Sequence, residues 1–168
     1  MLREYVPELP DHLQTSVFDR LIDPSPDLSN DPLESAAQRF SRLKEIFRRD
    51  LEAILNTRRW VHTTPKPLGE LSDSLLNYGV SDFIGASVIT TGERERMALA
   101  IEETIARTEP RFHDVHVEVL EPADGIERVL HMRICAVVTL SEGARPLTFE
   151  TALDPSTRHF SVSEQNRR

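Results

Sequence analysis

The fold is decided by a segment near the C-terminal end of the chain that reads VLHMRICAVVTL, from Val129 to Leu140. Its centre is apolar at consecutive positions, which is typical of a strand covered on both faces. Alternating apolar residues predict further strands around Val115–Val119, Leu147–Leu153 and Arg158–Val162. Turn-forming residues separate them, including Gly143–Pro146, so we expect consecutive strands to pair as an antiparallel meander.

Two long helices are predicted ahead of these strands. The first begins at Pro32, because Asp31 can cap it and Glu34 completes a capping box. The second follows Thr90 and ends before Pro110, which disfavours helical geometry in the preceding residue. Helices followed by consecutive strands predict an α+β domain, with N-terminal helices packed on a C-terminal antiparallel sheet of three to four strands.

Shorter features lie along these helices and between them. On the first helix, Glu45 and Arg49 are four residues apart in the order that favours an ion pair. A short helix is predicted over Leu71–Tyr78, and Gly79 suits the left-handed position after its end.

Charge is spread unevenly over the 168 residues, whose formal net charge is −8. Residues 1–37 carry eight acids against two arginines, a net of −6, and residues 38–60 carry seven bases against three acids, a net of +4. Five of the eleven prolines lie in residues 1–32, which prevents a long helix there. We therefore expect an extended acidic arm (1–31), a single α+β domain (32–163) and a polar tail (164–168).

The acidic arm contains one apolar cluster, Val17, Phe18, Leu21 and Ile22. A disordered tail has little reason to carry such residues so close together. We expect one helical turn that docks on this domain or on a neighbouring protein, and a loose tail is the alternative.

Composition excludes several classes of protein. A charge of −8 argues against nucleic-acid binding, which needs a basic face for phosphate. The apolar runs are too short to cross a bilayer, and the N-terminus lacks the apolar core of a secretory signal. The single cysteine, Cys135, cannot form an internal disulfide. These features predict a cytoplasmic protein without direct membrane insertion.

Motifs for chemistry are weak. The six glycines form no phosphate-binding loop, and no serine lies in a G-x-S-x-G motif. Three histidines near the predicted sheet lack a carboxylate or thiolate at a set spacing: His113, His116 and His131. Acidic pairs such as Glu102 with Glu103, or Asp50 with Glu52, point to different sides of a helix and could not flank a sugar. We expect no catalytic residue, no metal ligand and no cofactor.

One polar cluster stands out where the second helix meets the sheet, at Glu109-Pro110-Arg111-Phe112. A glutamate at a helix C-terminus meets the negative end of the helix dipole, so a cation should compensate it. Arg111, Arg58 or Arg59 could supply that cation. The cluster is then either an internal ion pair that fixes the joint or a fork of donors and acceptors offered to a partner.

At these residues the chain resembles the TssE family, the baseplate subunits of bacterial type VI secretion systems, and the related lysozyme-like wedge proteins of contractile phage tails. The matching motifs follow one another in order and span about residues 16–162: Ser16–Leu21, Asp50–Arg58, Leu75–Gly79, Glu109–Phe112, Val115–Val117 and Thr148–Asp154.

The resemblance implies a structural protein of the bacterial cytoplasm without enzymatic activity. It implies binding to the wedge components TssF and TssG, with TssK in the same baseplate, through Glu109, Pro110 and Arg111, and more weakly Arg58. It also implies a role in starting the contractile TssB–TssC sheath. A strand that faces the sheath is expected near Arg158, Phe160 and Val162, where an edge strand could pair with a partner's strand.

A different class of function stays open. The same fold superfamily includes a small anti-adaptor of regulated proteolysis, so the chain could be a regulatory adaptor or anti-adaptor that binds a signalling protein. The motifs around Arg20 and Asn56–Arg58 favour the baseplate subunit.

Overall fold

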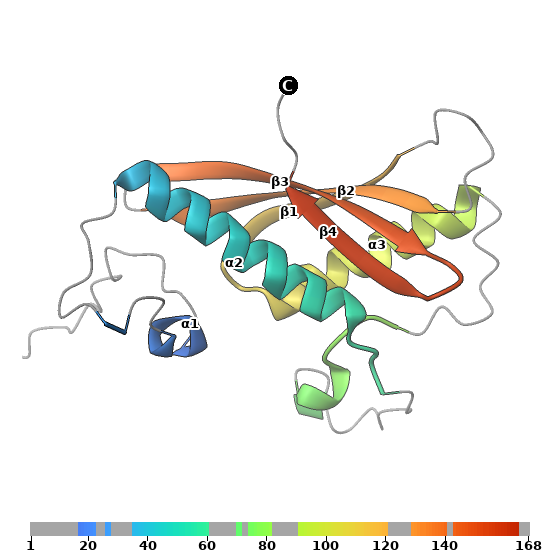
Figure 1. Cartoon of the computed structure of the whole chain (residues 1–168). Helices are drawn as coiled ribbons and strands as arrows, with labels where there is room; N and C mark the ends of the chain where they lie inside the picture. The colour runs from blue at the N-terminus through green and yellow to red at the C-terminus, as the bar shows by residue number, and fades with distance from the viewer. Residues whose placement is uncertain are drawn as a thin grey trace, which may run out of the picture.

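The structure is a computed structural model that describes residues 17–22, 26–27, 35–60, 70–71, 74–81, 91–120, 129–140 and 143–164. Within these ranges the elements are α1 (Val17–Leu21), α2 (Ala36–Asn56), the 3₁₀ turn η2 (Leu75–Asn77), α3 (Thr91–Thr108), β1 (Phe112–Leu120), β2 (Leu130–Leu140), β3 (Gly143–Asp154) and β4 (His159–Glu164). The four strands form an antiparallel sheet in the order β1-β2-β3-β4. The predicted α+β fold is confirmed (Figure 1).

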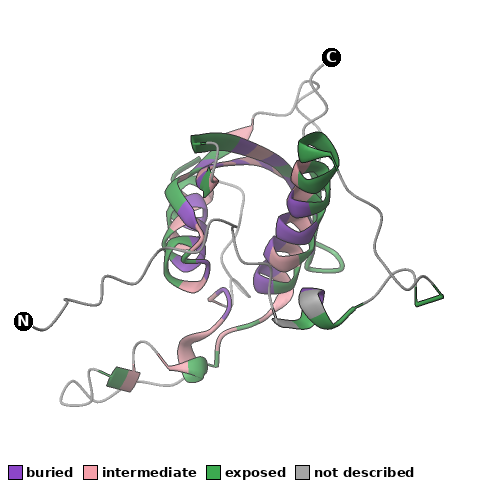
Figure 2. Cartoon of the chain, turned by 90° about the vertical axis from the view of Figure 1, so that its left-hand side faces the viewer, coloured by how far each residue is buried: buried purple, intermediate pink, exposed green. Residues whose placement is uncertain are grey.

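The core lies between one face of the sheet and the two long helices. Figure 2 shows α2 and α3 side by side under the curved sheet, with their buried sides turned toward it. Phe47 and Leu51 of α2, and Ile134 and Val138 of β2, are fully buried. β2 has a neighbouring strand on each side, as its apolar sequence predicts. In the described part of the chain, no helix has the length and apolar character needed to span a membrane.

The predicted start of the first long helix is wrong. α2 begins at Ala36, and Ser35 is its N-cap. The hydroxyl of Ser35 accepts a hydrogen bond from the backbone N–H of Gln38, while the Gln38 side chain accepts one from the Ser35 N–H. Ser35 and Gln38 thus form a second capping box, which directly follows the predicted one at Asp31 and Glu34. Asp31 and Pro32 lie outside the described residues.

Two predictions about the strands also need correction. β3 begins at Gly143, so the segment 143–146 is strand and not turn, with Pro146 opposite Val137 of β2. β4 pairs only with Phe149–Asp154 of β3, so segment 143–146 of β3 pairs with β2 alone. A proline is tolerated in a strand that is paired on one side only. Arg158 has a positive φ of 57° in the turn before β4, so the last strand starts one residue later than predicted.

The described residues of the predicted short helix are 3₁₀ at Leu71 and in η2, and not α-helical. Gly79 follows it with φ 91°, which confirms the left-handed position. A Cβ atom at Gly79 would lie 2.3 Å from the carbonyl oxygen of Thr57. This close approach lets Val80 N–H donate to Thr57 and Arg59 N–H donate to Val80, so the chain after η2 lies beside the end of α2.

Candidate protein-binding site

The joint between α3 and β1 is a tight turn. The Glu109 N–H donates to Ile105 at 2.8 Å, and Phe112 N–H donates to the Glu109 carbonyl at 3.1 Å. Pro110 stands exposed at the tip, whereas Glu109 is 5% exposed. β1 continues through a bulge between His113 and His116, which lets Phe112 enter the core.

The guanidinium of Arg111 donates two hydrogen bonds to the buried Glu109 carboxylate. Its Nε donates to Oε1 of Glu109 at 2.6 Å, and its Nη2 donates to Oε2 at 2.5 Å. The same Nη2 lies 2.7 Å from Oδ2 of Asp50 in α2. Arg111, rather than Arg58 or Arg59, is therefore the cation that compensates the glutamate at the helix end. The cluster is an internal ion pair that fixes the joint.

The guanidinium of Arg111 also lies over an aromatic ring. Its central carbon is 4.7 Å from the ring centroid of Phe47, whose own neighbour is Phe112 at 4.8 Å between centroids. Burial alone would lower the pKa of Arg111, but its hydrogen bonds to Glu109 and Asp50 outweigh that effect and raise the pKa. Arg111 thus stays charged and holds α2 against the end of α3.

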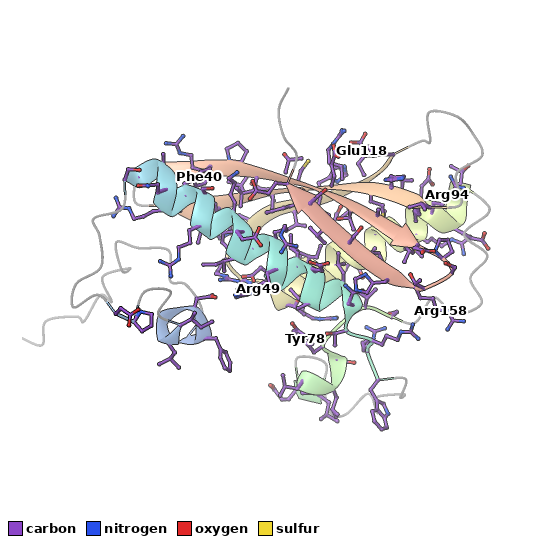
Figure 3. All side chains as sticks on the ribbon, in the orientation of Figure 1. Phe40, Arg49, Tyr78, Arg94, Glu118 and Arg158 are labelled. Atoms are coloured by element: carbon purple, nitrogen blue, oxygen red, sulfur yellow. The ribbon has the colours of Figure 1, made fainter. Side chains whose placement is uncertain are left out.

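The ion pairs continue toward the N-terminal arm. Nη2 of Arg49 donates to Oδ1 of Asp50 at 2.9 Å and to Oδ1 of Asp19 in α1 at 2.8 Å. Charges therefore alternate along one chain of contacts, from Asp19 through Arg49, Asp50 and Arg111 to Glu109. Figure 3 shows Arg49 on the side of α2 that is turned toward α1. The predicted Glu45–Arg49 pair gives way to this arrangement, and Glu45 binds Arg48.

The predicted helical turn in the arm exists, but Phe18, Leu21 and Ile22 of its apolar cluster do not anchor it. Asp19 is 6% exposed, while Phe18, Leu21 and Ile22 are 78%, 75% and 59% exposed. α1 is therefore held to α2 through a carboxylate and presents apolar side chains to solvent. We call Glu109, Pro110, Arg111 and Asp50, together with α1, the corner.

Tyr78 lies near Asp50 and Glu109 of the corner. Burial raises the pKa of its phenol, and the negative charges of Asp50 and Glu109 raise it further. η2, directly before it, exposes Leu75 and Leu76. Exposed apolar groups thus lie on two elements, on α1, which is bonded to the charged cluster through Asp19, and on η2, which directly precedes Tyr78.

The other residues singled out in the sequence lie elsewhere. Arg58 follows α2, where its backbone bridges to Val80. Phe160 and Val162 of β4 are each 6% exposed, so their side chains belong to the core, and Arg158 is exposed in the turn. β4 is an edge strand, as expected.

His116 and three of the paired acids have ordinary structural neighbours. His116 Nδ1 lies 3.1 Å from Oε2 of Glu102, which also accepts the backbone N–H of Val117. Asp50 binds Arg111, and Glu52 binds Arg48. Across the described ranges, no three His, Cys, Asp or Glu side chains gather as a metal site would require.

Sequence reasoning missed the roles of Asp19, Arg49 and Asp50. Asp19 and Asp50 both belong to motifs that carried the family resemblance, and Asp50 lies three residues after Phe47 on the same helix. This spacing places a carboxylate beside the buried stripe. The partner of that carboxylate lies on another element, which the spacing alone does not show.

Residues 41–142 match the family of the baseplate wedge protein gp25. The chain belongs to this wedge family. The match confirms the family resemblance seen in the motifs, and it favours a structural baseplate component over an adaptor. No curated protein matches the chain. A chain of a solved structure described as the baseplate complex from the type VI secretion system is 17% identical, with a TM-score of 0.47, covering 71% of this chain and 99% of that one.

Proposed function

We propose that the chain is a TssE-type baseplate subunit of a bacterial type VI secretion system. In this role it lies in the cytoplasm, binds the TssF–TssG wedge core beside TssK, and helps to start the TssB–TssC sheath. Membership of the wedge family and the ordered motifs between residues 16 and 162 support the proposal. Residues 1–31 serve as an arm to the single domain 32–163, and residues 164–168 as a polar tail.

The corner is the surface we assign to the wedge core. Glu109 is too buried to meet a partner directly, but Pro110 is exposed, and the Arg111 and Asp50 side chains are 20% and 23% exposed. Glu109 and Arg111 therefore set the shape of the corner, while Pro110 and the apolar residues of α1 supply contact area. Exposed apolar side chains that are rimmed by polar residues are typical of protein-binding surfaces.

The observation that carries this assignment is the exposure of Phe18 and Leu21 on a turn whose aspartate is buried. A free tail would gain nothing from anchoring such residues at the surface. The test is co-purification of the double variant Phe18→Ser/Leu21→Ser with TssF–TssG from the native host. We expect loss of the complex with an unchanged melting temperature.

Leu99→Ser is the matched control, because Leu99 is 58% exposed on α3 away from the corner. It should co-purify normally. Equal recovery of both variants would remove the corner from the interface.

We assign the start of the sheath to the edge strand β4 with Arg158, Phe160 and Val162. Because the two apolar side chains face the core, the strand offers the outward Ser161 and Ser163 to the sheath. A cysteine at Ser163 should cross-link to TssB or TssC in assembled baseplates, and a cysteine at exposed Arg96 of α3 should not.

A further inference from the structure

The outer edge of β4 is occupied by a side chain of α2. The Phe160 N–H donates to Oδ1 of Asn56 at 2.9 Å, and Nδ2 of Asn56 donates to the Phe160 carbonyl at 2.9 Å. Both backbone groups of Phe160 therefore point away from β3, as they do at every second residue of an antiparallel edge strand. The amide of Asn56 makes the two hydrogen bonds that a neighbouring strand would make.

Further side chains of α2 continue this contact along the strand. Nη1 of Arg48 donates to the Val162 carbonyl at 3.2 Å, and Nζ of Lys44 lies 2.5 Å from the Glu164 carboxylate. Residues 44, 48 and 56 are separated by multiples of four, so they lie on one inclined row of the helix surface. Glu52, between them, holds Arg48 at 2.6 Å. We call Lys44, Arg48 and Asn56 the seam.

The opposite edge of the sheet is covered in a similar way. Glu102 of α3 accepts the backbone N–H of Val117 in β1 at 2.9 Å. Each edge strand is thus met by a polar side chain from the helix that packs beside it. Proteins protect such edges because unpaired backbone groups are templates for pairing with another chain.

The sequence of β4 shows why its edge depends on the helix. Between His159 and Ser163 it carries no lysine, arginine, aspartate, glutamate or proline, which are the residues that usually protect an edge from within the strand. Its outward side chains at 161 and 163 are serines, which are small enough to lie against another strand. Protection must therefore come from α2.

We propose that the outer edge of β4 is a latent strand-pairing surface that the seam keeps closed, and that its occupant once the seam is removed is β4 of a second copy of this chain. Two copies related by a two-fold axis would pair antiparallel, which joins their sheets into one. The inference stands on the contacts of α2 with β4 and does not depend on the role in a baseplate.

The test compares Asn56→Ala with the wild-type chain by light scattering over a range of concentrations. We expect the variant to dimerise with a dissociation constant at least about tenfold lower, since two hydrogen bonds that compete with the second copy are lost. Hydrogen exchange at the Phe160 amide should become faster when the variant is dilute and monomeric. Arg39→Ala, on an exposed part of α2, is the control and should behave as wild type.

Two further variants guard the result. Asn56→Ser is too short to reach either backbone group of Phe160, so it should dimerise even if Asn56→Ala fails to fold. Adding Ser161→Lys and Ser163→Lys should restore the monomer, because like charges would face each other across the new pair. A folded Asn56 variant that stays monomeric, or a dimer that the lysines do not dissolve, would overturn the proposal.

Discussion

Nη2 of Arg111 lies 2.7 Å from Oδ2 of Asp50, a residue that precedes it by 61 positions, and the same guanidinium holds the buried Glu109. This single side chain joins the middle of α2, the end of α3 and the start of β1. The Glu109-Pro110-Arg111 motif, which the sequence also allowed as a partner-binding fork, thus first of all stabilises the domain. Any role in assembly acts through the shape that it maintains.

Arg111→Ala should destabilise the isolated domain by about 3 kcal/mol, because Glu109 would be left buried without its cation. The measurement is the free energy of unfolding in urea. Arg96→Ala, at an exposed position of α3, should cost under about 0.5 kcal/mol.

The combination with Glu109→Gln separates charge from packing. Removing the buried charge should restore a large part of the stability lost in Arg111→Ala. If the double variant is as unstable as the sum of the two single variants, the ion pair is not the cause.

Asp19→Ala should release α1 while leaving the domain almost as stable as before. Arg49 is about half exposed, so its pair with Asp19 contributes only about 0.5–1 kcal/mol. The expected result is faster hydrogen exchange in residues 17–22 at an unchanged melting temperature. Asp27→Ala, an exposed position of the same arm, should leave that exchange as it is.

Gly79→Ala should cost more than about 2 kcal/mol, because the new methyl group would collide with the Thr57 carbonyl at a backbone angle that alanine rarely adopts. Gly92→Ala is its counterpart in α3, where an added Cβ meets nothing within 4 Å. That variant should be neutral or stabilising by about 0.5 kcal/mol or more. The measurement is the melting temperature of both variants, and an equal shift in the two would contradict this explanation.

Tyr78 gives a prediction at alkaline pH. Its folded-state pKa is raised above the ordinary 10.0, by burial first and then by Asp50 and Glu109. The folded state therefore favours the neutral phenol, and this stabilisation is complete below pH 10 and is lost as the pH rises through the folded pKa. The tyrosinate absorbance, taken as the difference from Tyr78→Phe, should titrate above 10.0, and Asp50→Asn should bring the midpoint down.

Much of the fold could be predicted because the local spacing of apolar residues differs between helices and strands. The change from helical spacing to alternation marks the sheet, and the apolar centre of Val129–Leu140 places β2 between two neighbours. The start of α2 was harder, since two capping boxes follow each other and both satisfy the same rule. Pro146 predicts a turn locally, but the structure holds it in a strand, because β4 is too short to pair with this part of β3.

The site was less accessible to sequence reasoning. The conflict between Glu109 and the helix dipole indicated that a cation is needed, and Arg111 is that cation. Whether the pair faces inward depends on Phe47 and Asp50, which approach only after α2 packs on the sheet. Long-range contacts of this kind have no local spacing to reveal them.

The three faces of α2 described above restrict how this helix can change in sequence. Toward the sheet it carries the buried stripe, along β4 it carries the seam, and toward α1 it carries Arg49 and Asp50. From Leu43 onward this leaves Ala53 as an exposed position that none of the three sets of contacts uses, whereas Arg39 and Ser41, in the first turns, are exposed outside them. Substitutions should therefore be tolerated mainly near the start of α2, and a saturation screen of this helix should show a steep fall in tolerance about two turns in.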